Sequence, residues 1–476
     1  MNILMIMSDE HSYNAMACSG HKVLRTPNLD KLATEGAFFS NCYTNSPLCV
    51  PARASWFTGK YVNSLGTWDN ATAYDGKVKG ISHYLSEKGY EVTSFGKTHF
   101  HADGDIAGFN ASMPGWLKKL DVGAYYRNTA ECKPDAAERF NDIKMRNEKS
   151  HDDKVFDLAA TWLKAKKNSD RPWMLNIGYF DPHFPFIVKE EYWNYYNNII
   201  ADIPEEARAP FTSLNEPLKS LQKYFKCEML DREMIRKLYI GYYASVAQLD
   251  ENVGKLLGVL EQQGFADDTI VIYTSDHGEQ LGCHGLWWKC CMFEESAHIP
   301  LIVRVPGAKK GKEISNPVSL VDILPTICEG MEIPVPDSID GSSLLNLVMG
   351  KTELKRRDFV FSEYHGHGTP RGMYMIRWKN WKYVYYVGCE PQLFNLENDP
   401  HENYDLITYN GDSDTVKRVV KECDRRLREI CNPEEVDERA RGFQTRISRE
   451  LGLDRVDFQE AINMEHTYLP HPESRK

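Results

Sequence analysis

The sequence predicts an α/β fold with a mostly parallel central sheet sandwiched by helices, followed by a smaller C-terminal α+β domain with an antiparallel sheet. Short apolar, β-branched or aromatic runs alternate with helical patterns over the first three quarters of the chain. This alternation is typical of parallel sheets covered on both faces. From about Lys351 the pattern changes to closely spaced strands and a charged helix. We therefore expect two domains, residues 1–350 and 351–476.

The first domain supplies the expected parallel strands and two clear helices. The strands are expected at residues 2–7, 90–95, 173–180 and 270–275. One helix is expected to begin at Thr26-Pro27, with threonine as N-cap and proline in the first turn, and to end at Gly36. The second covers residues 246–260, where apolar residues recur three and four positions apart.

The C-terminal domain is expected to begin its sheet with a hairpin. Residues 372–378 and 381–387 have the alternation of paired strands, and 392–396 is expected to add a third strand. A helical tail follows, with residues 413–430 as its clearest part.

Composition limits the function classes. The chain has 476 residues, a formal net charge of -11 and no long Lys/Arg run, which argues against a nucleic-acid partner. The apolar run 3–7 is too short for a signal peptide, and no segment is long and apolar enough to span a bilayer. We therefore expect a cytoplasmic protein with no membrane partner and with reduced thiols among its 12 cysteines, unless a leader has been removed.

Chemically active side chains follow all four predicted parallel strands. Asp9-Glu10-His11 follows the first strand, residues 96–99 the second, 181–185 the third and 276–282 the fourth. Because ligands of open α/β sheets bind at the carboxyl ends of the strands, these side chains are expected to meet. Carboxylates, imidazoles and a lysine together indicate a metal-assisted site for an anion.

Three of these residues form a plausible set of metal ligands. Asp9, Asp276 and His277 offer two carboxylates and one imidazole. Carboxylate oxygens suit Ca²⁺, Mg²⁺ or Mn²⁺, whereas the imidazole favours Mn²⁺ or Zn²⁺. Taken alone, Asp9 is equally consistent with a helix cap.

Cys49 lies in the segment 45–61, and several roles are possible for this cysteine. Only three residues separate Cys49 from Arg53, whereas the cysteine phosphatases have five, so a thiolate nucleophile fits badly. A disulfide is disfavoured by the expected compartment, and a zinc site lacks further ligands at the usual spacing. A simply buried thiol leaves Pro51, Arg53 and Thr58-Gly59 unexplained.

The segment CVPARASWFTG, beginning at Cys49, resembles the C-x-P-x-R signature of the formylglycine-dependent (type I) sulfatases of the alkaline phosphatase superfamily. Residues 89–99 resemble the second signature of that family, 284–289 the third, and 392–402 its usual ending. The resemblance runs from residue 3 to about residue 406, with four motifs in family order.

Within this family, the chain most resembles the branch of choline sulfatases and phosphonate monoester hydrolases. The residues that carry this resemblance are 69–70, 276–277, 286–287 and 362–365. Four residues depart from the pattern: Cys283 and His284, Ala52, and Glu10, which stands where many members have a second aspartate ligand. Members of this branch tend to be oligomeric, so a homo-oligomer is an expectation, with the tail 466–476 reaching a neighbour.

The resemblance implies how the site works. A maturase would oxidise Cys49 to formylglycine, and its hydrate would attack sulfur. One divalent cation, Ca²⁺ by expectation and Mn²⁺ or Mg²⁺ as alternatives, would be held by the residue at position 49 together with Asp9, Asp276 and His277. The remaining expected roles are polarisation of the diol by Arg53, binding of the sulfate by Lys97, Lys289, His183 and Asn70, protonation of the leaving alcohol by His183 with help from Lys289, and removal of the last proton by His99.

The predicted function is hydrolysis of a small-molecule or saccharide sulfate monoester to alcohol and sulfate. A phosphonate monoester or phosphodiester is the close rival, because the site suits any tetrahedral oxyanion. A binding protein that has lost catalysis is a third possibility, which the intact motif residues disfavour. If choline sulfate is the substrate, aromatic side chains are expected to face its ammonium group.

Three further groups are expected to lie outside the chemistry. His365 and His367 are expected in a loop, Cys290-Cys291 in the packing, and the aromatic residues of 191–196 in the core or an interface.

Overall fold

The computed structural model describes residues 1–100, 107–109, 111–112, 136–166, 171–204, 207, 214–351 and 356–453. The segment 466–476, expected to reach a neighbouring subunit, lies outside the described residues. Among the described helices, none combines the length and the hydrophobicity needed to cross a bilayer.

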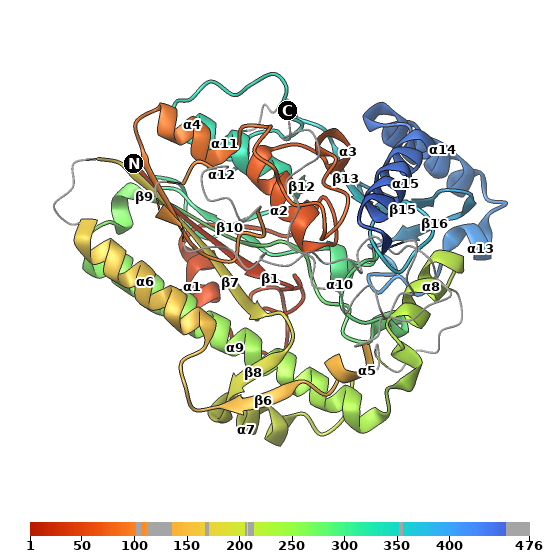
Figure 1. Ribbon diagram of the computed structural model, residues 1–476, viewed down its shortest axis with the longest axis horizontal. Coiled ribbons are helices and arrows are strands. Elements are labelled where there is room, and N and C mark those ends of the chain that lie inside the picture. Colours follow the sequence, from red (N-terminus) through yellow and green to blue (C-terminus); the bar gives the residue numbers. More distant parts are fainter. Residues whose placement is uncertain are drawn as a thin grey trace.

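A mostly parallel sheet of eight strands forms the centre of the molecule (Figure 1). Its strands, in spatial order, are β11 (Lys312–Ile314), β2 (Ala37–Phe39), β10 (Leu301–Arg304), β9 (Thr269–Ser275), β1 (Asn2–Asp9), β7 (Trp173–Pro182), β4 (Glu91–Gly96) and β5 (Ala111–Ser112). The four expected strands are confirmed as the adjacent, parallel group β9-β1-β7-β4. Among the described strands of this sheet, only β10 runs antiparallel to its neighbours.

Helices cover both faces of the sheet, as expected. Along β1, Ile3 and Met5 pack on one face with α2 (Cys49–Thr58), α4 (Ile81–Glu87) and α11 (Ile323–Gly330). Leu4 and Ile6 pack on the other face with α1 (Pro27–Glu35), α6 (His151–Ala165) and α9 (Arg232–Gln262). Because successive residues of a strand point to opposite faces, this strand, apolar from Ile3 to Met7, is buried between two helical layers. Figure 1 shows α6 and α9 lying together on their side of the sheet.

The two predicted helices form, but one is capped differently and the other is longer. α1 begins at Pro27 and ends before Gly36, as expected, yet the Thr26 side chain makes no capping hydrogen bond. Instead, the carboxylate of Asp250 in α9 accepts hydrogen bonds from the amides of Asn28 (3.2 Å) and Leu29 (2.8 Å). The expected helix 246–260 is the second half of α9, which has 31 residues.

The C-terminal sheet is antiparallel, in the order β13 (Phe359–Tyr364), β14 (Met373–Trp378), β15 (Trp381–Tyr386) and β16 (Cys389–Asn395). The expected hairpin and third strand are confirmed as β14-β15-β16, and β13 extends the sheet. The helical tail consists of α13 (Leu406–Asn410), α14 (Asp414–Ile430) and α15 (Pro433–Glu450).

Shorter elements connect these layers. The remaining strands are β3 (Cys42–Tyr43), β6 (Ile143–Arg146), β8 (Phe186–Lys189) and β12 (Val318–Ser319), paired as β12-β3 and β6-β8. The remaining α-helices among the described residues are α3 (Val62–Leu65), α5 (Ala136–Arg139), α7 (Glu190–Ile199), α8 (Glu216–Tyr224), α10 (Glu294–Ala297) and α12 (Leu345–Val348).

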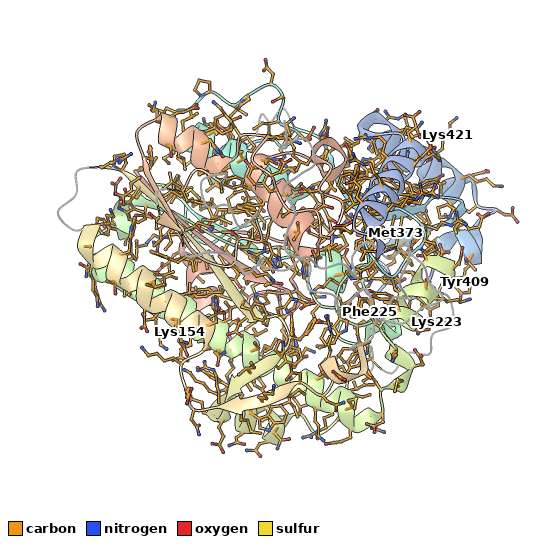
Figure 2. The ribbon with its side chains drawn as sticks, viewed as in Figure 1. Lys154, Lys223, Phe225, Met373, Tyr409 and Lys421 are labelled. Atoms are coloured by element: carbon orange, nitrogen blue, oxygen red, sulfur yellow. The ribbon has the colours of Figure 1, made fainter. Side chains whose placement is uncertain are left out.

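One hydrophobic cluster crosses the predicted domain boundary. It joins Leu48, Phe225 and Trp287 to Met373 and Phe394 of the C-terminal sheet. Figure 2 labels Phe225 and Met373, two buried members of this cluster. The division at residue 350 stays a prediction, but the described parts on either side of it share a core.

The packing roles expected for two groups are confirmed. Cys290 and Cys291 are completely buried. In the segment 191–196, Tyr196 is buried and its aromatic neighbours pack against the same hydrophobic cluster. His365 follows β13, is fully buried and hydrogen-bonds Glu363 (2.9 Å).

Candidate active site

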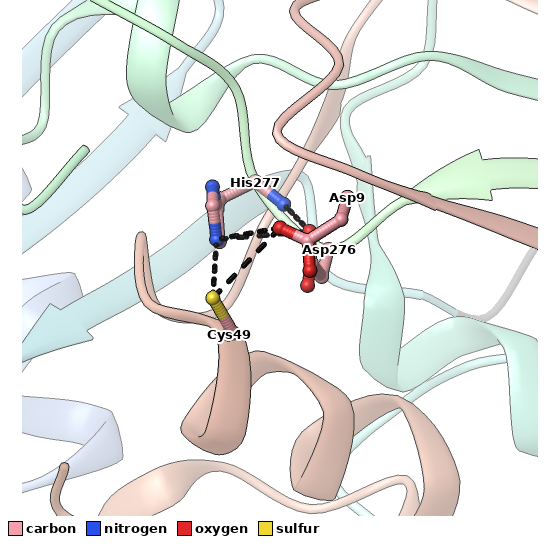
Figure 3. A group of neighbouring side chains, drawn as sticks. All are labelled: Asp9, Cys49, Asp276 and His277. Atoms are coloured by element: carbon pink, nitrogen blue, oxygen red, sulfur yellow. Dashed lines mark hydrogen bonds and ion pairs between the residues drawn. The ribbon is translucent and has the colours of Figure 1, made fainter. Parts of the chain in front are cut away.

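The predicted site residues meet at the carboxyl ends of the central strands. Asp9 is the last residue of β1, Asp276 and His277 follow β9, and Lys97 follows β4. Cys49 is the first residue of α2, which points its N-terminus at this edge of the sheet (Figure 3). The convergence expected from the strand ends is therefore present in the fold.

Four of these side chains form a buried group with the spacing of metal ligands. One ligand atom each of Asp9, Cys49, Asp276 and His277 lies within 4.8 Å of all the others. His277 Nε2 is 3.7 Å from Asp9 Oδ1 and 3.7 Å from Asp276 Oδ1. Oxygen or nitrogen ligands at right angles around one Ca²⁺ would be about 3.3–3.7 Å apart, so the two carboxylates and the imidazole fit a cation of this size.

The imidazole of His277 is oriented for metal binding. Its Nδ1 lies 3.0 Å from the carbonyl oxygen of Gly278. Since a carbonyl only accepts hydrogen bonds, Nδ1 carries a proton, and Nε2 is the ring nitrogen that faces Asp9 and Cys49. This orientation is what a metal-binding histidine requires.

Cys49 is poorly suited to act as a thiolate. Burial, and then the negative charge of Asp9, raise the pKa of the Cys49 thiol to about 12. Its Sγ lies 3.1 Å from His277 Nε2 and 3.8 Å from Asp9 Oδ1, inside the candidate cation site. The unmodified side chain is therefore a neutral thiol at neutral pH, which argues against a cysteine nucleophile.

Arg53 lies one helical turn after Cys49 and bonds the metal-site carboxylates. Its Nε donates to Asp276 Oδ2 (2.7 Å), and Nη2 is 3.4 Å from Asp9 Oδ2. Nη1 donates to the carbonyl of Lys97 (2.7 Å). All these hydrogen bonds go to carboxylates or main chain, so the described geometry makes Arg53 a positioning residue. Its expected contact with the diol stays a prediction.

Lys97 gives the site a second buried cation. Its Nζ forms an ion pair with Asp9 Oδ2, and its side chain is only 2% exposed. Burial opposes the ionised form of Asp9, but the charges of Lys97 and Arg53 hold the pKa of Asp9 well below its usual value. Asp9 is thus ionised and ready to bind a cation.

Lys289 and His183 form a hydrogen-bonded pair beside this group. Lys289 Nζ lies 2.6 Å from His183 Nε2, and His183 Nδ1 bonds the carbonyl of Phe184. Because that carbonyl only accepts, the proton of His183 is on Nδ1, and Nε2 accepts from Lys289. Burial and the charge of Lys289 hold the pKa of His183 well below its usual value. The proton shared by the pair therefore lies on Lys289.

Two other expected residues lie close to these groups. Burial, then the charges of Lys97 and Arg53, hold the pKa of His99 well below its usual value, so its imidazole is neutral at neutral pH. Asn70 uses its side-chain oxygen to accept from the amide of Val50 (3.1 Å) at the start of α2. Contacts of either side chain with sulfate stay predictions.

Three buried carboxyl groups that the sequence did not assign surround the site. Glu10 contacts both Lys289 (3.0 Å) and His183 (3.4 Å). Burial raises the pKa of Glu10 to about 8, against the opposing effect of Lys289. Glu279 accepts from the amides of Leu281 (2.8 Å) and Trp288 (2.8 Å), and so holds the loop that carries Lys289.

Asp152, at the start of α6, is the third buried carboxyl group, and it holds the turn that carries His183 through hydrogen bonds to backbone amides. Its carboxylate accepts from the amides of Phe180 (2.9 Å) and Asp181 (2.8 Å). Glu279 falls inside the motif 276–282 and was within reach of sequence reasoning, whereas nothing in the local sequence distinguishes Asp152.

Comparison with known proteins assigns the family. A family profile described as Sulfatase matches residues 1–333. This chain belongs to the sulfatase family. A second profile, described as N-sulphoglucosamine sulphohydrolase, C-terminal, matches residues 282–432 of the sulfatase. The family resemblance drawn from the four motifs is thus confirmed.

Named relatives agree with this assignment. The sulfatase is 32% identical over 419 residues to the choline-sulfatase of Rhizobium meliloti (strain 1021), covering 84% of this chain and 81% of the relative. It is 30% identical over 442 residues to arylsulfatase K of Homo sapiens, covering 86% and 81%. The chain is therefore a sulfuric ester hydrolase.

Solved structures share the fold. One, determined in complex with its substrate D-glucosamine-2-N,6-O-disulfate, has a TM-score of 0.76 at 24% identity, covering 91% of the sulfatase and 99% of that chain. A phosphonate monoester hydrolase of Agrobacterium radiobacter has a TM-score of 0.72 at 23% identity, covering 90% and 95%. These similarities confirm the predicted α/β architecture.

Proposed function

We propose that this sulfatase hydrolyses a small-molecule or saccharide sulfate monoester by transferring the sulfuryl group to a formylglycine hydrate at position 49. The observation that carries the proposal is the position of Cys49. Its side chain lies among Asp9, Asp276 and His277 at the N-terminus of a buried helix, yet as a thiol it is a poor nucleophile. Conversion to an aldehyde hydrate would place an oxygen nucleophile at the same point.

A divalent cation would be held by Asp9, Asp276, His277 and the residue at position 49. When bound, it would lower the pKa of a coordinated hydroxyl and neutralise charge on the sulfate. We propose Ca²⁺, because the two carboxylates outnumber the single imidazole, with Mn²⁺ or Mg²⁺ as alternatives. Arg53 would keep both carboxylates in place.

The remaining side chains would bind the sulfate group and transfer protons. Lys97, Lys289 and the amide group of Asn70 would bind the sulfate oxygens, where positive groups stabilise developing charge. The Lys289–His183 pair would protonate the leaving alcohol, since Lys289 carries the shared proton. His99, neutral in this site, would accept the proton whose removal releases sulfate.

The decisive test compares ester classes on one enzyme preparation. We expect kcat/KM for 4-nitrophenyl sulfate to exceed the values for 4-nitrophenyl phenylphosphonate and bis(4-nitrophenyl) phosphate. A sulfate ester that is hydrolysed more slowly than both would replace the proposal with the phosphonate or phosphodiester rival.

A substrate panel then addresses the alcohol portion. Choline sulfate, a glucosamine sulfate and an aryl sulfate would be compared at equal concentration, because the named relatives include a choline-sulfatase and an arylsulfatase.

The modification is tested by intact-peptide mass spectrometry. In protein from a host with a formylglycine-forming maturase, the peptide with Cys49 is expected to show the mass of an aldehyde and to react with hydrazide reagents. The Cys49→Ala variant supplies the matched control, with no label and no turnover. A fully active enzyme with only thiol at position 49 would overturn this part of the proposal.

A further inference from the structure

Glu10 occupies an unusual backbone position next to a predicted metal ligand. Its φ angle is 68°, in the left-handed region that residues with a side chain rarely adopt. Two hydrogen bonds fix this turn: the Glu10 amide donates to Asp276 Oδ1 (3.2 Å), and the Tyr242 hydroxyl donates to the Glu10 carbonyl (2.9 Å). The turn sends the Glu10 side chain in a different direction from the side chain of Asp9.

The Glu10 side chain thereby reaches the Lys289–His183 pair. Glu10 Oε1 lies 3.0 Å from Lys289 Nζ, and Oε2 lies 3.4 Å from His183 Nε2. One carboxyl group therefore contacts both members of a pair whose own separation is 2.6 Å. All three side chains are at least 88% buried, with exposed fractions of 1%, 8% and 12%.

The candidate cation site, by contrast, is formed without Glu10. The four-residue group contains Asp9, Cys49, Asp276 and His277. Glu10 belongs to a second group with the spacing of metal ligands, together with Asp9 and His183, and this group shares only Asp9 with the first. Glu10 thus lies on the side of Asp9 that faces the leaving-group residues.

We infer that Glu10 is a positioning residue that holds Lys289 and His183 together at the leaving-group side, and that it is not a ligand of the cation. The inference rests on the proposed function, because it assumes that this pair protonates the leaving alcohol. Lys289 and His183 come from separate loops, so a bridging group that touches both would fix their separation. Lys289 Nζ donates one hydrogen bond to His183, while Glu10 Oε1 faces the same ammonium group at ion-pair distance.

The test uses two substitutions of nearly equal volume. Glu10→Gln keeps a side-chain oxygen that can accept from Lys289, whereas Glu10→Leu removes both oxygens. Asp9→Asn is the control for loss of a metal ligand. Each protein is loaded with Ca²⁺, desalted and analysed for bound calcium per chain, and circular dichroism confirms the fold.

Activity is measured on two sulfate esters with different leaving groups. An alkyl sulfate needs a proton on its leaving oxygen, whereas 4-nitrophenolate departs without one. For Glu10→Leu we expect kcat for the alkyl sulfate to fall by about 10²-fold, a typical contribution of general acid catalysis, with a much smaller loss on 4-nitrophenyl sulfate. Glu10→Gln should recover part of the alkyl activity, and both variants should bind as much calcium as the parent.

Other results would overturn the inference. Loss of calcium from Glu10→Leu, as in Asp9→Asn, would make Glu10 a ligand. Equal losses on the two esters would make its role purely structural. If Glu10→Leu fails to fold, Glu10→Gln decides by the same two readouts. Failure of the proposed function is distinguishable, since the parent enzyme would then hydrolyse neither sulfate ester.

Discussion

Arg53 is buried and forms ion pairs with two buried carboxylates, those of Asp9 and Asp276. Its side chain is 1% exposed, and those of Asp9 and Asp276 are fully buried. Removing one partner of such a group leaves buried charges without compensation, which is costly. The residue therefore contributes to stability as well as to the shape of the candidate cation site.

We predict that Arg53→Met lowers the free energy of unfolding of the cation-free protein by about 3–5 kcal/mol. Urea denaturation in the presence of a chelator would measure it. Arg53→Lys should lose less, because it keeps the charge but not the planar fork. An unchanged urea midpoint for Arg53→Met would contradict the assigned contacts.

The buried carboxyl group of Asp181 makes the stability of the fold depend on pH. Burial, and then the neighbouring Asp152, raise the pKa of Asp181 from its usual value of 3.8 to about 8. The folded state thus holds this proton more tightly than the unfolded chain. Its stabilising contribution is complete below about pH 4 and is lost as the pH rises to about 8.

The Asp181→Asn substitution should remove this contribution, because an amide does not titrate in this range. We expect the difference in unfolding free energy between variant and parent to move in favour of the variant from pH 5 to pH 8.5. Denaturant titrations at several pH values would measure the trend. Parallel curves for the two proteins would show that Asp181 does not titrate as described.

At the scale of elements, the ends of β4 and β7 approach too closely for a side chain. A Cβ atom on Gly178 would lie 2.0 Å from the carbonyl oxygen of Lys97. The same approach allows the Lys97 amide to donate to the Gly178 carbonyl (2.8 Å). The glycine therefore lets the strand end place Lys97 within reach of Asp9.

We predict that Gly178→Ala lowers the unfolding free energy by about 1–3 kcal/mol or more, because the backbone must move to accept the methyl group. Gly258→Ala is the matched control, since a Cβ there meets nothing within 4 Å and lies in the helix α9. The control should be neutral or stabilising by about 0.5–1 kcal/mol. Thermal unfolding and sulfatase activity would be measured for both variants. We expect Gly178→Ala, and not Gly258→Ala, to lower both, because only Gly178 lies against Lys97.

The elements were predictable where their signals were local. The strand of residues 2–7 and the hairpin of 372–387 show in the sequence because each carries its own apolar pattern. The cap of α1 was not predictable, since the carboxylate of Asp250 comes from a helix more than 200 positions away. The first half of α9 was missed for a similar reason: it is buried on many sides and lacks a single apolar stripe.

At the scale of the whole molecule, a buried charge cluster joins the two predicted domains. Lys382 of β15 lies 2.9 Å from Glu294 of α10 and 2.9 Å from Glu402. Its side chain is fully buried. Together with the hydrophobic cluster across residue 350, this arrangement predicts that the described parts unfold together.

We predict that Lys382→Met destabilises the protein by about 3–5 kcal/mol, because two buried carboxyl groups lose their shared cation. The double variant with Glu402→Gln should recover part of the loss. Denaturant unfolding followed by tryptophan fluorescence and circular dichroism would give both values. A single variant as stable as the parent would contradict the assigned role of the cluster.

The composition of the candidate site was largely predictable from the sequence, whereas its internal contacts were not. Asp9, Cys49, Asp276 and His277 come together because strand ends converge and α2 points at them. That Arg53 bonds carboxylates, and that Glu10 reaches Lys289, depends on side-chain directions and a left-handed turn. Such directions arise from tertiary packing, which a motif does not encode.

Helix α9 binds three separate segments within a short part of its length: the turn at Glu10, the end of β7 and the start of α1. Tyr242 bonds the turn at Glu10, Ser245 and Gln248 bond Asp181, and Asp250 caps α1. These four residues span only about 12 Å of a rigid rod. We therefore expect the three attached segments to move together with α9, so that residues from distant parts of the chain keep nearly constant relative positions when the molecule flexes.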